Sequence, residues 1–202
     1  MKIAILTDTH WSARKASRNL HDYFQLFYDN VFFPALEEHG VETVIHMGDA
    51  FDNRKSIDFW GLDWTKKVVL EPLRKYQVHM IVGNHDIFLR NSTEINAPEL
   101  LLKDYSNIKT YSSPTNTKVC GIDMTFIPWI CSENYDETLK VIRKLKAKIA
   151  MGHLELKGFR VNKLLKVFLF GLFTNNHLNN FIRILRSIKS LMRSILIINV
   201  IE

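Results

Sequence analysis

Four short polar clusters, each placed directly after a short apolar run, most constrain the fold of this 202-residue chain. Each run is short enough to be one buried strand: Ile3–Leu6, 41–47, 78–82 and 147–151. Segments with helical spacing of apolar residues separate them: 20–31, 62–73 and 139–145. The alternation predicts an α/β layered domain. Pro34 is expected to break or kink the first helix where it continues beyond residue 31.

The clusters themselves are rich in carboxylates and imidazoles: Asp8-Thr9-His10, Gly48-Asp49-Ala50-Phe51-Asp52, Gly83-Asn84-His85-Asp86 and Gly152-His153. They fall just beyond strand ends, where sites form in open α/β sheets. Oxygen and imidazole ligands without thiolates suit Mn²⁺, Mg²⁺, Fe²⁺ or Zn²⁺. Two such ions can hold a phosphate and activate water for in-line attack. Asp49 is the natural shared ligand, because the preceding glycine lets the backbone turn tightly.

In this order, the four clusters resemble the calcineurin-like metallophosphoesterases. The stretches Ile127-Pro128-Trp129 and Met151-Gly152-His153-Leu154-Glu155-Leu156-Lys157-Gly158-Phe159 extend the resemblance to the nuclease subunit of SbcCD-type DNA repair complexes, including its T-even-type phage version. The resemblance covers roughly residues 1–163. It implies the layered calcineurin-like α/β fold, with β-sheets flanked by helices.

The resemblance also implies the metal ligands. It makes Asp8 and His10 ligands of one ion, Asp49 the bridge, and Asn84 and His153 ligands of the other. Two divalent ions are therefore expected, with Mn²⁺ favoured over Mg²⁺, Fe²⁺ or Zn²⁺.

Other residues of the clusters receive supporting roles from the same resemblance. His85 would stabilise the transition state or protonate the leaving oxygen, and Asp86 would orient His85. Asp52 is expected to lie behind the metal ligands and to support them, without being a ligand itself. Arg54 and Lys55 follow the second cluster and are candidate contacts to DNA phosphates, although a solvated basic pair fits nearly as well.

The implied activity is hydrolysis of DNA phosphodiesters by an exonuclease and endonuclease acting in recombination and repair of DNA ends. The implied partners are DNA and an SMC-like ATPase subunit, and a homodimer is compatible with both. We expect the N-terminus not to act as a signal peptide, because Asp8 and His10 interrupt its apolar run. The expected location is the cytoplasm, or the host cytoplasm for a phage protein.

The family's fifth motif, Gly-His-x-His, does not occur in this sequence, and the only histidine after His153 is His177. The chain also changes character at residues 164–202, which hold five Lys or Arg against one Glu and so carry most of the net charge of +6. We therefore expect a phosphoesterase domain at 1–163, incomplete at its C-terminus, followed by a frameshifted or truncated tail. Membrane association of a basic amphipathic helix in the tail is a less favoured interpretation.

Two other functions stay open at this point. The clusters alone also fit a generic metallophosphoesterase that acts on a small phosphoester. The missing histidines fit a non-catalytic remnant. Four further histidines carry no motif and are expected to be structural or solvated: His21, His39, His46 and His79.

Overall fold

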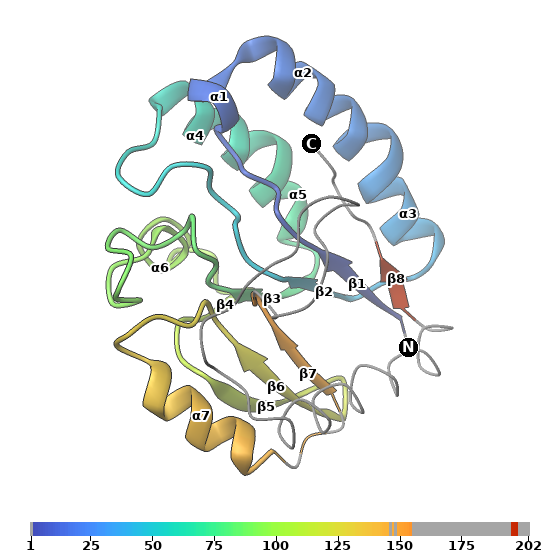
Figure 1. The fold of residues 1–202 in the computed structure, drawn as a ribbon. Helices are drawn as coiled ribbons and strands as arrows, with labels where there is room; N and C mark the ends of the chain where they lie inside the picture. Colours follow the sequence, from blue (N-terminus) through green and yellow to red (C-terminus); the bar gives the residue numbers. More distant parts are fainter. Residues whose placement is uncertain (1, 146, 148, 155–194, 198–202) are drawn as a thin grey trace, which may run out of the picture.

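Two β-sheets lie between layers of helices in the computed structural model, which describes residues 2–145, 147, 149–154 and 195–197 (Figure 1). The first sheet has the order β4-β3-β2-β1-β8, and all its neighbouring strands are parallel. Its strands are β1 (Ile3–Leu6), β2 (Thr43–His46), β3 (Gln77–Ile81), β4 (Ile108–Tyr111) and β8 (Ile195–Ile197). Parallel strands joined through helices confirm the predicted α/β layered fold.

The second sheet has three strands in the order β5-β6-β7. Its strands are β5 (Thr115–Val119), β6 (Ile122–Ile127) and β7 (Ile149–Gly152). The pair β5–β6 is antiparallel and the pair β6–β7 is parallel. The strand predicted at 147–151 is therefore β7, which belongs to a different sheet from the other three predicted strands.

Helices fill the connections between the strands. Before β2 come α1 (Ala13–Ala16), α2 (Arg18–Phe27), η1 (Tyr28–Phe32) and α3 (Phe33–Glu38). Before β3 come α4 (Phe59–Thr65), η2 (Lys66–Leu70) and α5 (Glu71–Leu73), and α6 (Ala97–Leu101) and α7 (Tyr135–Arg143) follow. None of the helices in these described ranges is long and apolar enough to cross a membrane.

Pro34 does not break its helix. It lies in the first turn of α3, and a π-helical turn, η1, directly precedes it. Pro72 lies in the same way in the first turn of α5, after the π-helical turn η2. A proline ring clashes with the carbonyl one turn earlier, and a wider π turn changes that spacing. Both long helices therefore continue past their prolines.

The alternation of side chains along β1 divides the core into two. Ala4 and Leu6 face the helices, in a core that includes Phe32 of η1 and Leu70 of η2. Ile3 packs on the opposite side, against residues of the second sheet such as Phe126. A third, smaller cluster joins the far side of the second sheet to α7. The order of layers is thus helices, sheet, sheet, helix.

Most of the tail lies outside the described residues. The exception is β8, which pairs in parallel with β1 and extends the first sheet by one strand. His177, the rest of 164–202 and the expectation of a frameshifted or truncated terminus all concern that undescribed part of the chain.

Candidate metal centre

The first two clusters lie side by side because the hydrogen-bond ladder of β1 and β2 continues beyond the strands. The amide of Asp8 donates to the carbonyl of Gly48 at 3.1 Å, and the amide of His10 donates to the carbonyl of Asp49 at 3.1 Å. The amide of Trp11 then donates to the carbonyl of Ala50 at 2.8 Å. Parallel pairing therefore fixes the first loop against the second over its whole length.

Asp8, His10 and Asp49 all have positive φ, at 51°, 44° and 52°. Residues other than glycine rarely adopt this conformation, and each such residue costs about 1–3 kcal/mol. The ladder of the preceding strands must hold it in place. Three of the predicted ligands are thus among the strained residues, together with others such as Ser12 and Cys120.

Two glycines leave room for the Asp49 carboxylate and for His153. A Cβ on Gly48, whose φ is +111°, would lie 2.6 Å from Nδ1 of His153. A Cβ on Gly83 would lie 2.2 Å from Oδ1 of Asp49. Both distances are far inside van der Waals contact, so only glycine fits at either position without displacing a site residue.

The third cluster contacts Asp49 through its backbone. The amide of His85 donates to Oδ1 of Asp49 at 2.8 Å. Nδ1 of His85 lies 2.8 Å from the carbonyl oxygen of Asp52. Because a carbonyl only accepts, Nδ1 carries the proton, and the other ring nitrogen, Nε2, remains available.

His153 reaches the same place from β7 of the second sheet. Its Nδ1 lies 3.1 Å from the carbonyl oxygen of Met47, so this nitrogen also carries the proton. Its Nε2 lies 2.9 Å from Oδ1 of Asn84 and 3.4 Å from Oδ2 of Asp49. The Nε2 atom is thereby aimed at two oxygen atoms of the first sheet.

The potential ligand atoms form two groups, and Asp49 belongs to one of them. Those of Asp8, Asp49 and His153 lie within 4.8 Å of one another, as do those of His10, Asp52 and His85. Oδ2 of Asp49 also lies 3.9 Å from Nε2 of His10. The structure thus brings all five predicted ligands close together. Asp8, however, falls in the group of Asp49 and His153, and His10 falls in the other group.

The donor set fits divalent cations. Carboxylate, amide and imidazole donors without thiolates suit hard or borderline ions. Nδ1 of His10 is buried without a hydrogen-bond partner among the described residues, although Oδ1 of Asp52 lies 3.4 Å away. A buried polar atom normally has a hydrogen-bond partner, a water molecule or an ion beside it.

Asp49 and His153 shift each other's ionisation. Burial alone raises the pKa of Asp49, but the hydrogen bond and charge of His153 and the His85 amide hold that pKa below its usual value. Burial alone lowers the pKa of His153, but the Asp49 carboxylate outweighs burial and raises that pKa. The carboxylate therefore carries its full negative charge in the middle of the site.

Comparison with protein families decides which kind of site this is. The model of the calcineurin-like phosphoesterase family matches residues 1–187. The chain belongs to this family of metal-dependent hydrolases. The phosphoesterase is also 37% identical, over 132 residues, to exonuclease subunit 1 of Enterobacteria phage T4. That match covers 64% of this chain and 39% of the T4 protein, so the chain spans only part of its relative's length.

Several solved structures are also similar, and one of them matches most of the chain. It is a protein of unknown function from Aquifex aeolicus, with a TM-score of 0.46 and 14% sequence identity, over 81% of each chain. This likeness is too weak to bear on the function of the phosphoesterase.

The orienting role predicted for Asp86 does not match the geometry. Its carboxylate is buried and accepts hydrogen bonds from the amides of Phe51, at 3.0 Å, and Gly83, at 2.9 Å. The ring of His85 is held instead by the carbonyl of Asp52. In this phosphoesterase, Asp86 joins the second loop to the third. Burial, against these two hydrogen bonds, raises the pKa of Asp86 to about 6.

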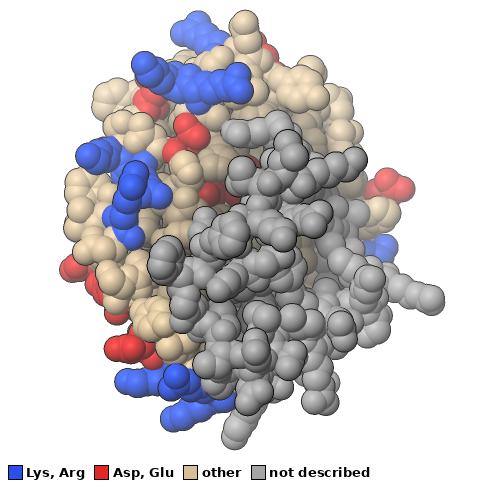
Figure 2. Space-filling view, in the orientation of Figure 1, with Lys and Arg blue, Asp and Glu red and all other residues tan. Residues whose placement is uncertain are grey.

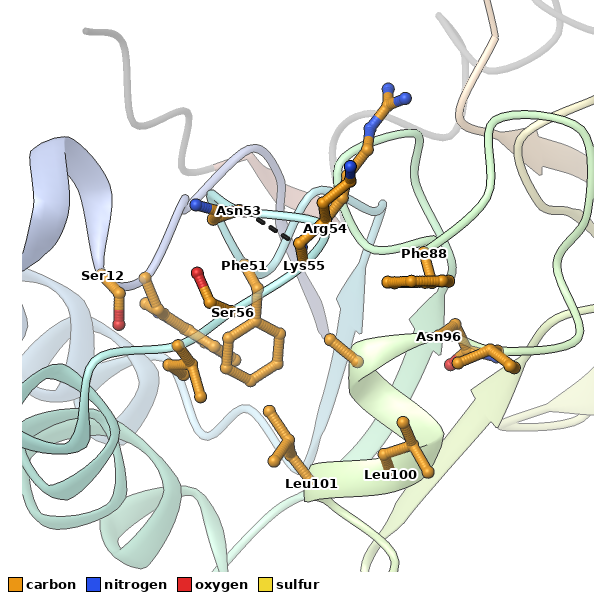
Figure 3. A pocket seen from close by; sticks show the side chains of 14 residues that line it. Ser12, Phe51, Asn53, Arg54, Lys55, Ser56, Phe88, Asn96, Leu100 and Leu101 are labelled. Atoms are coloured by element: carbon orange, nitrogen blue, oxygen red, sulfur yellow. Dashed lines mark hydrogen bonds between the residues drawn. The ribbon is translucent and has the colours of Figure 1, made fainter.

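Arg54 and Lys55 lie on the rim of a cavity of about 240 Å³ beside the site. Its floor is apolar and includes Phe51, Leu100 and Leu101. Figure 3 shows the side chains of Arg54 and Lys55 running away from this floor, with the backbone amide of Lys55 bonded to the side chain of Asn53. Lys55 is therefore exposed at the edge of the cavity, whereas Arg54 is partly buried and its Nη1 has no hydrogen-bond partner among the described residues.

His46 is the polar group that the sequence did not single out. It is buried at the end of β2, and burial lowers its pKa to about 3. Its Nε2 lies 2.9 Å from Oγ1 of Thr9, which stands between two predicted ligands. The one available signal was its place two residues before the second cluster, which is not a motif by itself.

We expect Gly83→Ala to damage the site and to cost stability as well, because the added methyl would also meet the backbone nitrogen of Asp49. The added methyl would displace the Asp49 carboxylate, so Mn²⁺ binding should weaken by about 10-fold or more. The control is Gly40→Ala, which meets open space but has a φ of +60° and should lose only about 1 kcal/mol of stability. Mn²⁺ titration followed by electron paramagnetic resonance measures the Mn²⁺ affinity of both variants, and urea denaturation measures their stability. An unchanged Mn²⁺ affinity in Gly83→Ala would contradict the assigned packing.

We expect Asp86→Asn to be less stable than the wild type by about 1–3 kcal/mol at pH 7, because an amide N–H₂ would then face a backbone N–H. Since the folded pKa lies above the ordinary 3.8, the ionisation of Asp86 costs the wild type stability as the pH rises from about 4 to 6. The difference between the two proteins should therefore be about 2 kcal/mol larger at pH 4 than at pH 7. Urea denaturation with EDTA measures it, with the exposed Asp63→Asn as control. A difference independent of pH would show that Asp86 ionises normally.

Proposed function

We propose that this chain is a two-metal DNA phosphodiesterase, with Mn²⁺ as its preferred ion. The observation that carries the proposal is the convergence of Asp8, His10, Asn84 and His153 around the Asp49 carboxylate, at the carboxyl edge of the first sheet. The similarity to a phage exonuclease subunit supports DNA as the substrate. On this proposal the chain acts on DNA ends in recombination and repair, together with an ATPase subunit.

We assign the ligands by the atoms that remain available. Asp49 stands between His10 and His153 and is the proposed bridge. Nε2 of His153, which lies 2.9 Å from Oδ1 of Asn84, is the ring nitrogen that could bind an ion, because Nδ1 faces the carbonyl of Met47. Asp8 and Asn84 supply further oxygen ligands. The bound ions would supply charge that stabilises the developing negative charge and a nucleophile at neutral pH.

We propose that Asp52 supports the ligands from behind, which is the role expected from the sequence. Its carboxylate lies 3.4 Å from Nδ1 of His10, and its carbonyl lies 2.8 Å from Nδ1 of His85. A metal-binding imidazole is commonly oriented in this way by an oxygen atom on its other nitrogen. Asp52 thus holds the ring of His85 and lies beside the ring of His10; the two ring centroids are 4.9 Å apart and their planes are nearly perpendicular.

His85 is the proposed proton donor. With Nδ1 committed to the Asp52 carbonyl, Nε2 is the atom that can carry a second proton and give it to the leaving oxygen of a phosphodiester. A deoxyribose alkoxide is a strongly basic leaving group and needs this proton. A nitrophenolate leaves without it.

The test of the proposed function compares two substrates, a DNA duplex and bis-p-nitrophenyl phosphate, both with Mn²⁺. Asp49→Ala should abolish hydrolysis of both, because the bridge is lost. His85→Ala should reduce DNA cleavage by about 10²- to 10⁴-fold and affect the nitrophenyl ester much less. Lys67→Ala, an exposed change in an ion pair with Asp63, serves as the control.

The outcomes separate the alternatives. Hydrolysis of the nitrophenyl ester without DNA cleavage would favour a phosphoesterase for small substrates. Absence of both, together with absence of Mn²⁺ binding, would favour a non-catalytic remnant. Equal losses on the two substrates in His85→Ala would contradict proton donation by this residue.

We also propose that Arg54 and Lys55 contact DNA phosphates. Figure 2 shows Lys and Arg side chains along the left rim of this face, with Asp or Glu side chains between them. Removing both cations, in Arg54→Ala/Lys55→Ala, should weaken DNA binding and lower the slope of log affinity against log salt by about 2. Hydrolysis of the small ester should be unchanged. Lys66→Ala/Lys67→Ala is the matched control, since neither lysine lines the cavity. An unchanged salt slope would show that the pair is only solvated.

A further inference from the structure

His46 occupies the space between the first two ligand loops, beneath the site. It is the last residue of β2 and is 1% exposed. The indole of Trp11 covers it, with ring centroids 5.6 Å apart. Nothing in the proposed chemistry uses this imidazole directly, yet both of its nitrogens have partners that belong to the ligand loops.

The partners of His46 determine its protonation. The amide of Gly48 donates to Nδ1 at 3.2 Å. Because a backbone amide only donates, Nδ1 must be without a proton, and the proton of the neutral ring is on Nε2. Nε2 then donates to Oγ1 of Thr9 at 2.9 Å. The ring is thus a neutral connector that accepts from one loop and donates to the other.

Thr9 passes the connection back to the second loop. Its hydroxyl accepts from His46, so its own proton is free to reach the carbonyl of Ala50 at 3.3 Å. Thr9 is 3% exposed and lies between Asp8 and His10. Gly48 and Ala50 likewise lie on either side of Asp49. The chain of three hydrogen bonds therefore passes directly behind three of the proposed ligands.

We infer that His46 and Thr9 form a positioning pair, which sets the separation of Asp8 and His10 from Asp49. The inference rests on the proposed function, because it concerns the ligands named there. Those three ligands have positive φ, a conformation that persists only where the surroundings impose it. The backbone ladder fixes one edge of the two loops, and the His46–Thr9 pair fixes the interior between them.

A simpler role for His46 is to fill the core. The two roles differ in which measured property a substitution would change. A core-filling histidine would affect stability alone. A positioning pair would change metal affinity, and the effects of losing either member would not add, because each loss breaks the same connection.

The experiment measures Mn²⁺ binding to the full chain by electron paramagnetic resonance, beside thermal unfolding of the metal-free protein. Thr9→Val removes the hydroxyl with little change of shape. His46→Asn keeps an acceptor for the Gly48 amide but cannot reach Thr9. Each should weaken Mn²⁺ binding by about 10-fold or more, and the double variant should be no weaker than the worse single one. Thr9→Ser, which keeps the hydroxyl, should restore binding.

His79→Asn is the matched control. His79 lies one strand away on β3, where its Nδ1 pairs with the hydroxyl of Tyr111 at 2.7 Å, and it touches neither ligand loop through that bond. This variant should melt at a lower temperature yet bind Mn²⁺ as the wild type does.

The outcomes separate the inference from the proposed function. A wild-type chain that binds no Mn²⁺ overturns both. A wild-type chain that binds Mn²⁺ while Thr9→Val binds it equally well overturns the positioning pair alone. Additive losses, or an equal loss in His79→Asn, would show that the changes act through general stability, and would also overturn it.

Discussion

The parallel pairing of β1 with β2 is the interaction on which the rest of the site depends. Its ladder continues past both strands, from the Asp8–Gly48 bond to the Trp11–Ala50 bond. Because these hydrogen bonds are between backbone atoms, they fix the register of the two loops, and the side chains of His46 and Thr9 add a second connection between them. Polar side chains that would repel one another in water are thereby held together, and a cation can bind without first having to order them.

The third loop depends on the same pair. It has no ladder of its own with the second loop, so side-chain oxygens do the joining. Asp49 accepts from the amide of His85, and Asp86 accepts from the amides of Phe51 and Gly83. Two aspartates thus connect the neighbouring loops. The carboxylate of Asp49 faces the site, and that of Asp86 lies behind it. The same residue type has two functions here, and the environment decides which.

Much of this arrangement could be predicted from the sequence. Apolar runs followed by Asp, Asn or His predict strands with polar residues at their ends, and three of the four runs do lie in one parallel sheet. The role of Asp86 could not be predicted, since its partners are backbone amides whose positions depend on the fold. The role of His46 could not be predicted for the same reason. Its partners, Gly48 and Thr9, are brought to it by the register of β1 and β2. The π turns before Pro34 and Pro72 were also missed, because nothing in the local sequence distinguishes a widened turn from a kink.

His153 comes from a different sheet, and its partner Asn84 lies 69 residues earlier in the chain. During synthesis, the first three loops emerge well before the fourth ligand exists. An ion bound by all four loops would join two layers that already meet through apolar side chains and through hydrogen bonds such as that from the amide of Trp129 to the carbonyl of Val82, and its binding energy would add to the stability of that junction. The centre would therefore also hold the two layers together, because His153 reaches the other proposed ligands only when the two sheets have packed against each other.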